Sequence, residues 1–116
     1  MRILYKNKSV EKQFSSEYSR NWRYPQQVKK NLLMAENYIR NADSFQDLAA
    51  FHPFRLERLK GKRKDEWSIR IGGNTGYRVT LIPCDDKGEQ IVDGDIMAIC
   101  KTIRIALVTE VSNHYE

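Results

Sequence analysis

The chain has 116 residues, of which 20 are Lys or Arg and 15 are Asp or Glu, so its formal net charge is +5 at pH 7. This length is typical of a single domain, 1–116, and no apolar run is long enough to cross a bilayer. Lys6 and Lys8 interrupt the amino terminus before a signal-peptide core could form, and the two cysteines have no CxxC spacing. We therefore expect a cytoplasmic protein with no membrane segment, no metal site and no cofactor.

Helical patterns fill the amino-terminal half. Ser9 is a candidate N-cap for a helix over residues 10–22, whose large apolar residues recur at every fourth position. After Pro25, apolar residues in a 4-3-4-3 spacing predict a longer amphipathic helix over 28–42. Ser44 is a candidate cap for a short helical turn that follows it.

Beyond residue 54 the apolar pattern changes from helical to alternating. Strands are expected over 67–71 and 77–83, joined as a hairpin because the linking Gly-Gly-Asn-Thr-Gly accepts positive φ. Residues 97–112 carry apolar side chains on both parities, which predicts one central strand buried on both faces. The predicted fold class is α+β, with two N-terminal helices packed on a twisted antiparallel β-sheet.

The positive charge is concentrated in one stretch. Residues 54–70 contain seven basic and three acidic residues, a sum of +4 against +5 for the whole chain. Such a concentration is what binding to a phosphate backbone requires. Taken alone, a run such as KGKRK is more often a solvated turn. The candidate RNA-binding residues are Arg58, Lys60, Lys62, Arg63, Lys64 and Arg70.

A possible catalytic set lies in the same half of the chain. Metal-free RNA cleavage needs a base for the 2′-hydroxyl, a cation for the charged phosphorane and an acid for the leaving 5′-oxygen. Glu57 is the candidate base, Arg78 the cation and His114 the acid, with Tyr115 beside it. From composition and spacing alone the simpler interpretations are more common: salt-bridge partners on neighbouring strands for Glu57 and Arg78, and a solvated terminus for His114.

A family resemblance rests on two stretches, LKGKRKDEWSIRIGGNTGYRVTLIP and the ending EVSNHYE. From about residue 56 to the end, the chain resembles the RelE/HigB/YoeB superfamily of bacterial toxins, whose members carry L-K-G/H, a W-S-x-R strand and a YR or HR opening the next strand. The resemblance implies a RelE-like fold and the toxin of a type II toxin-antitoxin system, a metal-independent endoribonuclease that cleaves mRNA in the ribosomal A site. The implied partners are the 70S ribosome with its mRNA and a small helix-turn-helix antitoxin of the HigA type.

The resemblance also implies site residues. Glu57 falls where YoeB-like toxins place their carboxylate base, Arg78 on the arginine that opens the next strand, and His114 and Tyr115 on the terminal His-Tyr pair. HigB-like toxins usually carry a histidine at the first position and end in Asp-Tyr-His. Chain length therefore favours the HigB subfamily and the catalytic residues favour YoeB, and either terminal residue can be the acid. One alternative is a ParE-like toxin that inhibits DNA gyrase without cleaving RNA, and the presence of a base, a cation and an acid counts against it. Another is a basic RNA-binding module with no catalytic activity, which would bind RNA without forming a product.

Overall fold

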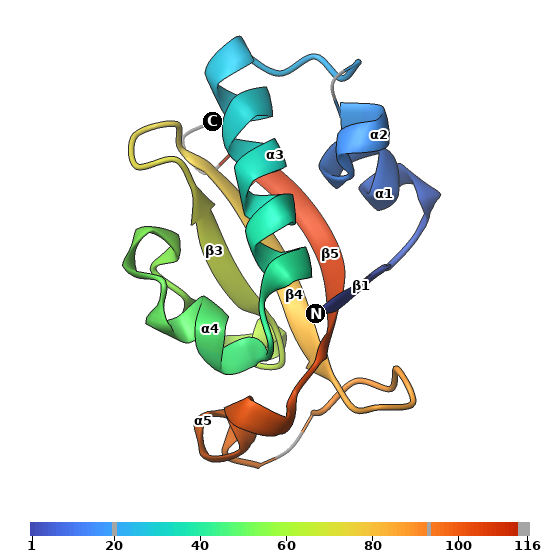
Figure 1. Cartoon of the computed structure of the whole chain (residues 1–116), viewed down its shortest axis with the longest axis vertical. Coiled ribbons are helices and arrows are strands. Elements are labelled where there is room, and N and C mark those ends of the chain that lie inside the picture. Colours follow the sequence, from blue (N-terminus) through green and yellow to red (C-terminus); the bar gives the residue numbers. More distant parts are fainter. Residues whose placement is uncertain (20, 93, 114–116) are drawn as a thin grey trace.

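A five-stranded mixed sheet forms the centre of the fold (Figure 1). The computed structural model describes residues 1–19, 21–92 and 94–113. The strand order is β1-β5-β4-β3-β2, and all neighbours are antiparallel except β1, which runs parallel to β5. The strands are β1 (Arg2–Tyr5), β2 (Glu57–Arg58), β3 (Trp67–Ile71), β4 (Tyr77–Cys84) and β5 (Ile105–Asn113).

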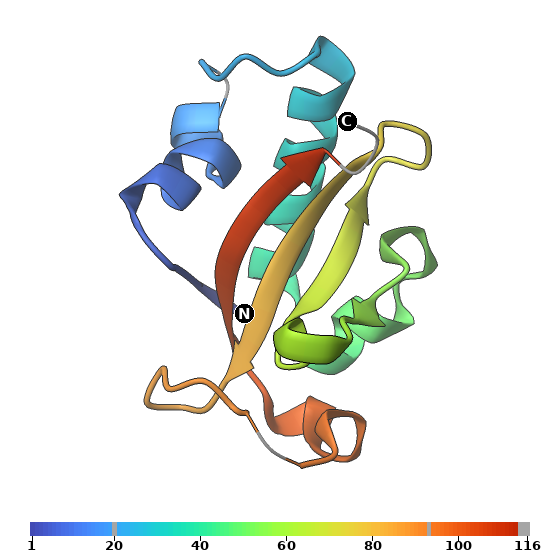
Figure 2. The same ribbon diagram turned by 180° about the vertical axis from the view of Figure 1, so that it is seen from behind.

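The longest helix, α3, crosses one face of the sheet, and in the view from behind no α-helix of the described chain crosses the other face (Figures 1 and 2). We call this second side the open face. None of the helices in the described ranges is long and apolar enough to span a membrane. The α-helices are α1 (Lys8–Phe14), α2 (Ser16–Ser19), α3 (Gln26–Asn41), α4 (Phe45–Ala50) and α5 (Ile96–Ile99), and the 3₁₀ turns are η1 (His52–Phe54), η2 (Gly61–Arg63) and η3 (Cys100–Thr102).

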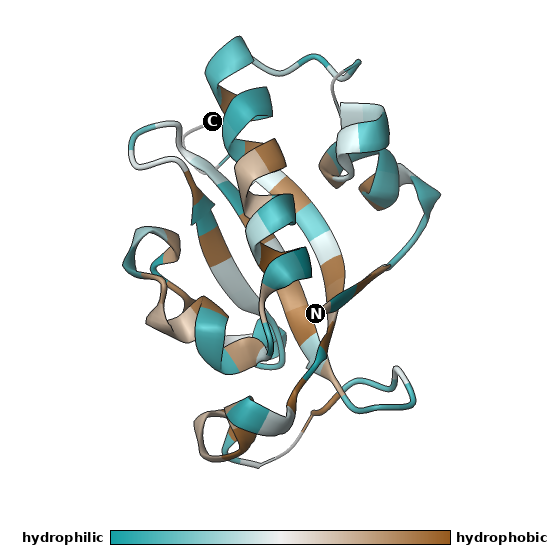
Figure 3. Ribbon diagram, in the orientation of Figure 1, coloured by the Kyte–Doolittle hydropathy of each residue, from teal (hydrophilic) through white to brown (hydrophobic). Residues whose placement is uncertain are grey.

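The hydrophobic core lies between α3 and the sheet. Leu32 and Ile39, two turns apart on α3, are fully buried, as are Ile69 on β3 and Val79 on β4. The outer side of α3 is largely hydrophilic, whereas brown segments dominate the strands behind it (Figure 3). Each fully buried aliphatic side chain stabilises the fold by roughly 1.5–3 kcal/mol relative to an exposed one, so this contact is what fixes α3 on the sheet.

The predicted helix over 28–42 is confirmed as α3, which begins directly after Pro25 because a first helical turn tolerates a residue without an N–H. The predicted helix over 10–22 is wrong. Asn7, not Ser9, caps α1, and its Oδ1 accepts the Val10 N–H at 2.9 Å. The chain turns extended after α1, so three helices, α1, α2 and α3, replace the predicted N-terminal pair.

The break between α1 and α2 has a tertiary cause. Glu36 of α3 is only 3% exposed, and its two carboxylate oxygens accept the Ser16 N–H at 3.2 and 3.3 Å. A new helix start leaves backbone N–H groups without intrahelical partners, and this buried carboxylate satisfies one of them. Arg40, one turn along α3, lies 3.5 Å from Glu36 and partly balances its charge.

The predicted hairpin is confirmed. β3 and β4 pair antiparallel with Ile71 opposite Tyr77, and Gly72 and Gly76 of the linking turn have φ values of 68° and 80°. The wholly antiparallel sheet is wrong, because β1 pairs with β5 in parallel and Arg2 lies opposite Ile105. The fold is therefore broadly α+β with a mixed sheet.

The predicted strand over 97–112 is wrong in its first half and correct in its second. Residues 96–102 form α5 and η3, and Asp95 Oδ1 accepts the Ala98 N–H at 3.3 Å as an N-cap. Ile96 and Cys100, four residues apart, are buried, whereas Met97 is exposed, which is the spacing of a helix. In the sequence, the same run of apolar residues also fits a strand that is buried on both faces. After a two-residue connection, residues from Ile105 onward form β5, which lies inside the sheet between β1 and β4.

Candidate nucleic-acid-binding and catalytic face

The strand register places Glu57 and Arg78 on the same side of the sheet. Glu57 lies opposite Ser68, and Ser68 lies opposite Thr80. Directly opposed residues point to the same side, and Arg78 is two residues from Thr80, so all four side chains share one side. The intervening residues, such as Val79, are buried against α3 on the other side. Glu57 and Arg78 therefore both belong to the open face (Figure 2).

Their spacing suits a ligand that lies between them. Glu57 and Arg78 are two strands and two residues apart, which corresponds to about 12 Å between Cα atoms at the usual strand spacings. Glu57 is exposed, Arg78 is half-buried, and neither forms an ion pair with a described residue. Both charged groups can therefore contact one ligand that lies across the open face.

A second arginine strengthens the positive end of this face. Arg70 of β3 lies directly opposite Arg78 of β4, which in turn lies opposite Ser112 of β5. Opposed like charges repel, and a bound anion would relieve that repulsion. The last described residue, Asn113, lies opposite Tyr77 at the same end of the sheet. His114 and Tyr115, the predicted acid and its neighbour, lie outside the described residues.

Arg63, a predicted RNA-binding residue, is already engaged by two carboxylates. Its Nε and Nη2 donate to Glu66 at 2.7 and 3.1 Å, and Nη2 also donates to Glu110 at 3.2 Å. The Thr109 hydroxyl donates to Glu66 at 2.7 Å, beside the register shift after Thr80. This cluster ties η2 to β5, so contact between Arg63 and RNA requires breaking existing ion pairs.

The same cluster sets the protonation behaviour of Glu66. Hydrogen bonds from Arg63 are the main reason that the pKa of Glu66 lies below its ordinary value, and Glu66 in turn raises the pKa of Arg63. A carboxyl whose pKa is lower in the folded state contributes stability above its unfolded pKa, and this contribution is lost as the pH falls through the folded pKa.

Replacing Glu66 with Gln is expected to lower the free energy of unfolding by about 1 kcal/mol at pH 7, because charge-assisted hydrogen bonds to Arg63 are lost. At pH 3 the difference from wild type should shrink, because this pH lies below the ordinary pKa of the carboxyl, where its contribution to stability decreases. Urea unfolding at both pH values measures this, with Glu89→Gln in the exposed turn after β4 as control. An equal difference at pH 7 and pH 3 would contradict it.

Arg58, another predicted RNA-binding residue, lies on the other side of the sheet. It is opposite Trp67, whereas its neighbour Glu57 is opposite Ser68, so the two side chains point to different faces. Arg58 Nε donates to the Lys64 carbonyl at 2.7 Å, and the guanidinium lies over the Trp67 ring, 5.6 Å from its centre. Arg58 therefore supports the η2 turn from the α3 side.

Three predicted RNA-binding lysines form an exposed rim around η2. Lys60, Lys62 and Lys64 are all exposed, and the turn that carries them lies beside the open face (Figure 2). Lysine side chains in such a position contact phosphates as mobile point charges. Of the six predicted RNA-binding residues, these three and Arg70 remain available to a ligand.

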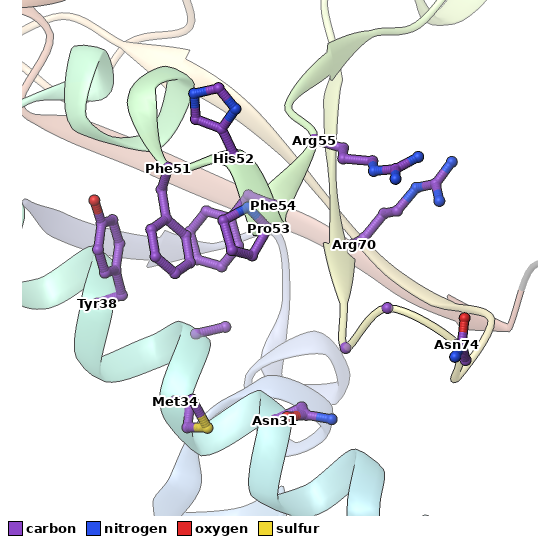
Figure 4. A pocket seen from close by; sticks show the side chains of 13 residues that line it. Asn31, Met34, Tyr38, Phe51, His52, Pro53, Phe54, Arg55, Arg70 and Asn74 are labelled. Atoms are coloured by element: carbon purple, nitrogen blue, oxygen red, sulfur yellow. The ribbon is translucent and has the colours of Figure 1, made fainter.

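Sequence reasoning missed a pocket of about 810 Å³ at the edge of β3 (Figure 4). The residues come from four separate segments, so no motif marks it; the aromatic FHPF sequence beside an arginine is the one local signal. Arg70 is common to this pocket and the open face. The pocket is lined by Asn31, Met34, Ala35, Tyr38, Phe51, His52, Pro53, Phe54, Arg55, Arg70, Gly72, Gly73 and Asn74.

No three His, Cys, Asp or Glu side chains lie close enough together to hold a metal ion in residues 1–19, 21–92 and 94–113.

Two comparisons with known proteins give no match. No protein-family model matches the chain, and no curated protein sequence matches it. Functional assignment therefore rests on the geometry of the open face and on the motif resemblance.

Proposed function

We propose that this protein is the toxin of a type II toxin-antitoxin system, a metal-independent endoribonuclease that cleaves mRNA on the ribosome and so inhibits translation. The observation that carries the proposal is the strand register that puts the Glu57 and Arg78 side chains on the same side of the sheet, the open face, with Arg70 opposite Arg78. A base and two cations on one face of the sheet match what phosphodiester cleavage needs.

In the proposed reaction, Glu57 removes the proton of a 2′-hydroxyl, and the resulting oxygen attacks the adjacent phosphorus. Arg78, helped by Arg70, stabilises the negative charge of the phosphorane. The bond to the 5′-oxygen breaks, and His114 or Tyr115 supplies the proton that this leaving group takes. The products are a 2′,3′-cyclic phosphate and a free 5′-hydroxyl, so this step consumes no water.

The exposure of the site supports dependence on the ribosome. Glu57 is open to water, and a catalytic base works best when a partner excludes solvent and holds the substrate in line. The lysine rim at Lys60, Lys62 and Lys64 offers phosphate contacts to ribosomal RNA and mRNA. The proposed location is the cytoplasm, and the proposed regulator is a HigA-like helix-turn-helix antitoxin with an acidic or apolar segment that covers the basic surface of this face.

A message with a single 2′-deoxy nucleotide at the mapped cut site tests the mechanism. On translating ribosomes we expect cleavage at that site to disappear, because the attacking oxygen is missing. The matched control carries the deoxy nucleotide one codon away and should be cut normally. Equal cleavage of both messages would rule out 2′-hydroxyl attack, and gyrase inhibition without any cleavage would favour the ParE-like alternative.

A further inference from the structure

The pocket at the edge of β3 has the size of a small-molecule site. Its volume of about 810 Å³ falls within the usual range for ligand pockets, which is roughly 300–1,000 Å³. It lies between α3, the residues 51–55 and the start of the β3–β4 turn (Figure 4). Neither Glu57 nor Arg78 lines it, and Arg70 is the residue that it shares with the proposed cleavage site.

Two arginines line one end of this pocket. In Figure 4 the side chains of Arg55 and Arg70 both extend away from the aromatic rings, and their guanidinium groups lie close together in this view. Neither makes an ion pair with any residue of the described ranges. Two cations that approach without an acidic partner favour a dianion such as a phosphate monoester, which arginine binds through paired N–H groups.

The backbone of Arg55 is unusual. With φ 44° and ψ 53° it is left-handed, the one non-glycine residue with positive φ among those described. Its N–H donates to the His52 carbonyl at 3.0 Å and closes the η1 turn. This conformation is unfavourable for a side chain with a Cβ, and residues held in this way cluster at binding sites. The η1 turn thus holds Arg55 at the mouth of the pocket.

Aromatic rings form the opposite end of the pocket. Tyr38 and Phe51 are stacked with ring centres 4.2 Å apart, and Phe54 lies edge-on to both at 5.3 and 4.8 Å. The Tyr38 hydroxyl donates to the Asp47 carbonyl at 3.1 Å, which helps to fix its ring. A rigid aromatic surface of this kind stacks well against a flat heterocycle.

The wall between the two ends is polar and tightly packed. A Cβ on Gly72 would lie 2.4 Å from Asn31 Nδ2, so glycine is needed where the turn approaches α3. The Asn31 amide therefore lies beside the pocket, and a second amide, Asn74, lines it from the turn. Amide groups can donate to and accept from the edges of a base.

We propose that this pocket binds a nucleoside monophosphate unit, with its phosphate on Arg55 and Arg70 and its base against Tyr38, Phe51 and Phe54. The charged and aromatic ends of the pocket match the two ends of that ligand. The proposal goes beyond the cleavage function, because binding requires neither Glu57 nor Arg78. Since Arg70 also borders the open face, the unit can be a free nucleotide or the phosphorylated end of an RNA chain.

Titration of the full chain with AMP, adenosine and ribose 5-phosphate, followed by heteronuclear NMR, tests the proposal. We expect AMP to bind at least about ten-fold more tightly than either fragment, because each fragment lacks one half of the contacts. Arg55→Asn, which tolerates the left-handed backbone, and Arg70→Gln should each weaken AMP binding about ten-fold or more. Lys101→Gln, which removes an exposed cation on η3, should leave it unchanged.

A blocking variant separates binding at this pocket from binding elsewhere. No atom lies within 4 Å of a Cβ added to Gly73, and its backbone is not left-handed, so Gly73→Phe should fold normally and place a bulky ring on the wall of the pocket. We expect AMP binding to be lost while the melting temperature is retained. Unchanged AMP affinity in Gly73→Phe or in the two arginine variants would overturn the proposal, as would ribose 5-phosphate binding as tightly as AMP.

A trinucleotide with a 5′-phosphate distinguishes the two sources of the ligand. Affinity equal to or above that of AMP assigns the pocket to an RNA end, and weaker affinity assigns it to a free nucleotide. These measurements need no ribosome. Absence of AMP binding by the wild-type chain together with normal mRNA cleavage, or the converse, therefore shows which of the two proposed activities fails.

Discussion

Replacing Glu57 with Gln is expected to reduce mRNA cleavage on the ribosome by about 10²- to 10⁴-fold, the usual effect of removing a group that transfers a proton. Glu57 is exposed and makes no ion pair with a described residue, so the loss should not come from unfolding. Gln keeps the shape of the side chain and removes its ability to accept the proton. Single-turnover cleavage of a defined message on purified ribosomes measures the rate, and urea unfolding measures stability.

The matched control for this variant is Glu89→Gln, which removes the same charge from the exposed turn after β4. Cleavage by this control should equal that of wild type. Arg78→Lys keeps the charge but loses the planar fork of donors, and its activity should lie between those of wild type and Arg78→Gln. Full cleavage by both Glu57→Gln and Arg78→Gln would show that the open face is not the catalytic site.

Replacing Phe45 with Ala is expected to lower the free energy of unfolding by about 3–5 kcal/mol, the range for deleting a fully buried phenyl ring. Phe45 is 0% exposed, and its ring lies edge-on to Trp67 with centres 5.5 Å apart. Its N–H donates to the Ile103 carbonyl at 2.8 Å. The residue joins α4, β3 and the segment before β5, so a cavity at this point loosens three elements together.

Equilibrium unfolding in urea, monitored by Trp fluorescence and by circular dichroism, measures this loss. Phe45→Leu leaves a smaller cavity, so it should lower the free energy of unfolding considerably less than Phe45→Ala does. Leu33→Ala on the outer side of α3 serves as the surface control, because Leu33 is 44% exposed and its truncation should change stability little. A cost below about 1 kcal/mol for Phe45→Ala would contradict the packing described for this corner.

The candidate site was only partly predictable. Glu57 and Arg78 could be named from the motif, but that they share a face depends on the pairing of β2, β3 and β4 in one register. A slip of one residue would put them on opposite sides. The assignment of His114 or Tyr115 as the general acid stays a prediction, since both lie outside the described residues.

Local sequence alone determined α3 and the β3–β4 hairpin. In α3 the apolar spacing matches the helical period along its whole length, and Pro25 marks its start. In the hairpin, alternation on both strands and glycines at positive φ leave few other conformations. Each of these signals comes from residues that are close in the chain.

Tertiary structure decided the features in which distant residues compete or cooperate. Buried Glu36 of α3 supports the break between α1 and α2, and pairing with β5 makes β1 a parallel strand. Glu66 and Glu110 engage Arg63, so a residue that looks cationic in sequence is neutralised by its neighbours in space. Charge and burial depend on what surrounds a side chain after folding, and the periodicity of the chain does not carry that information.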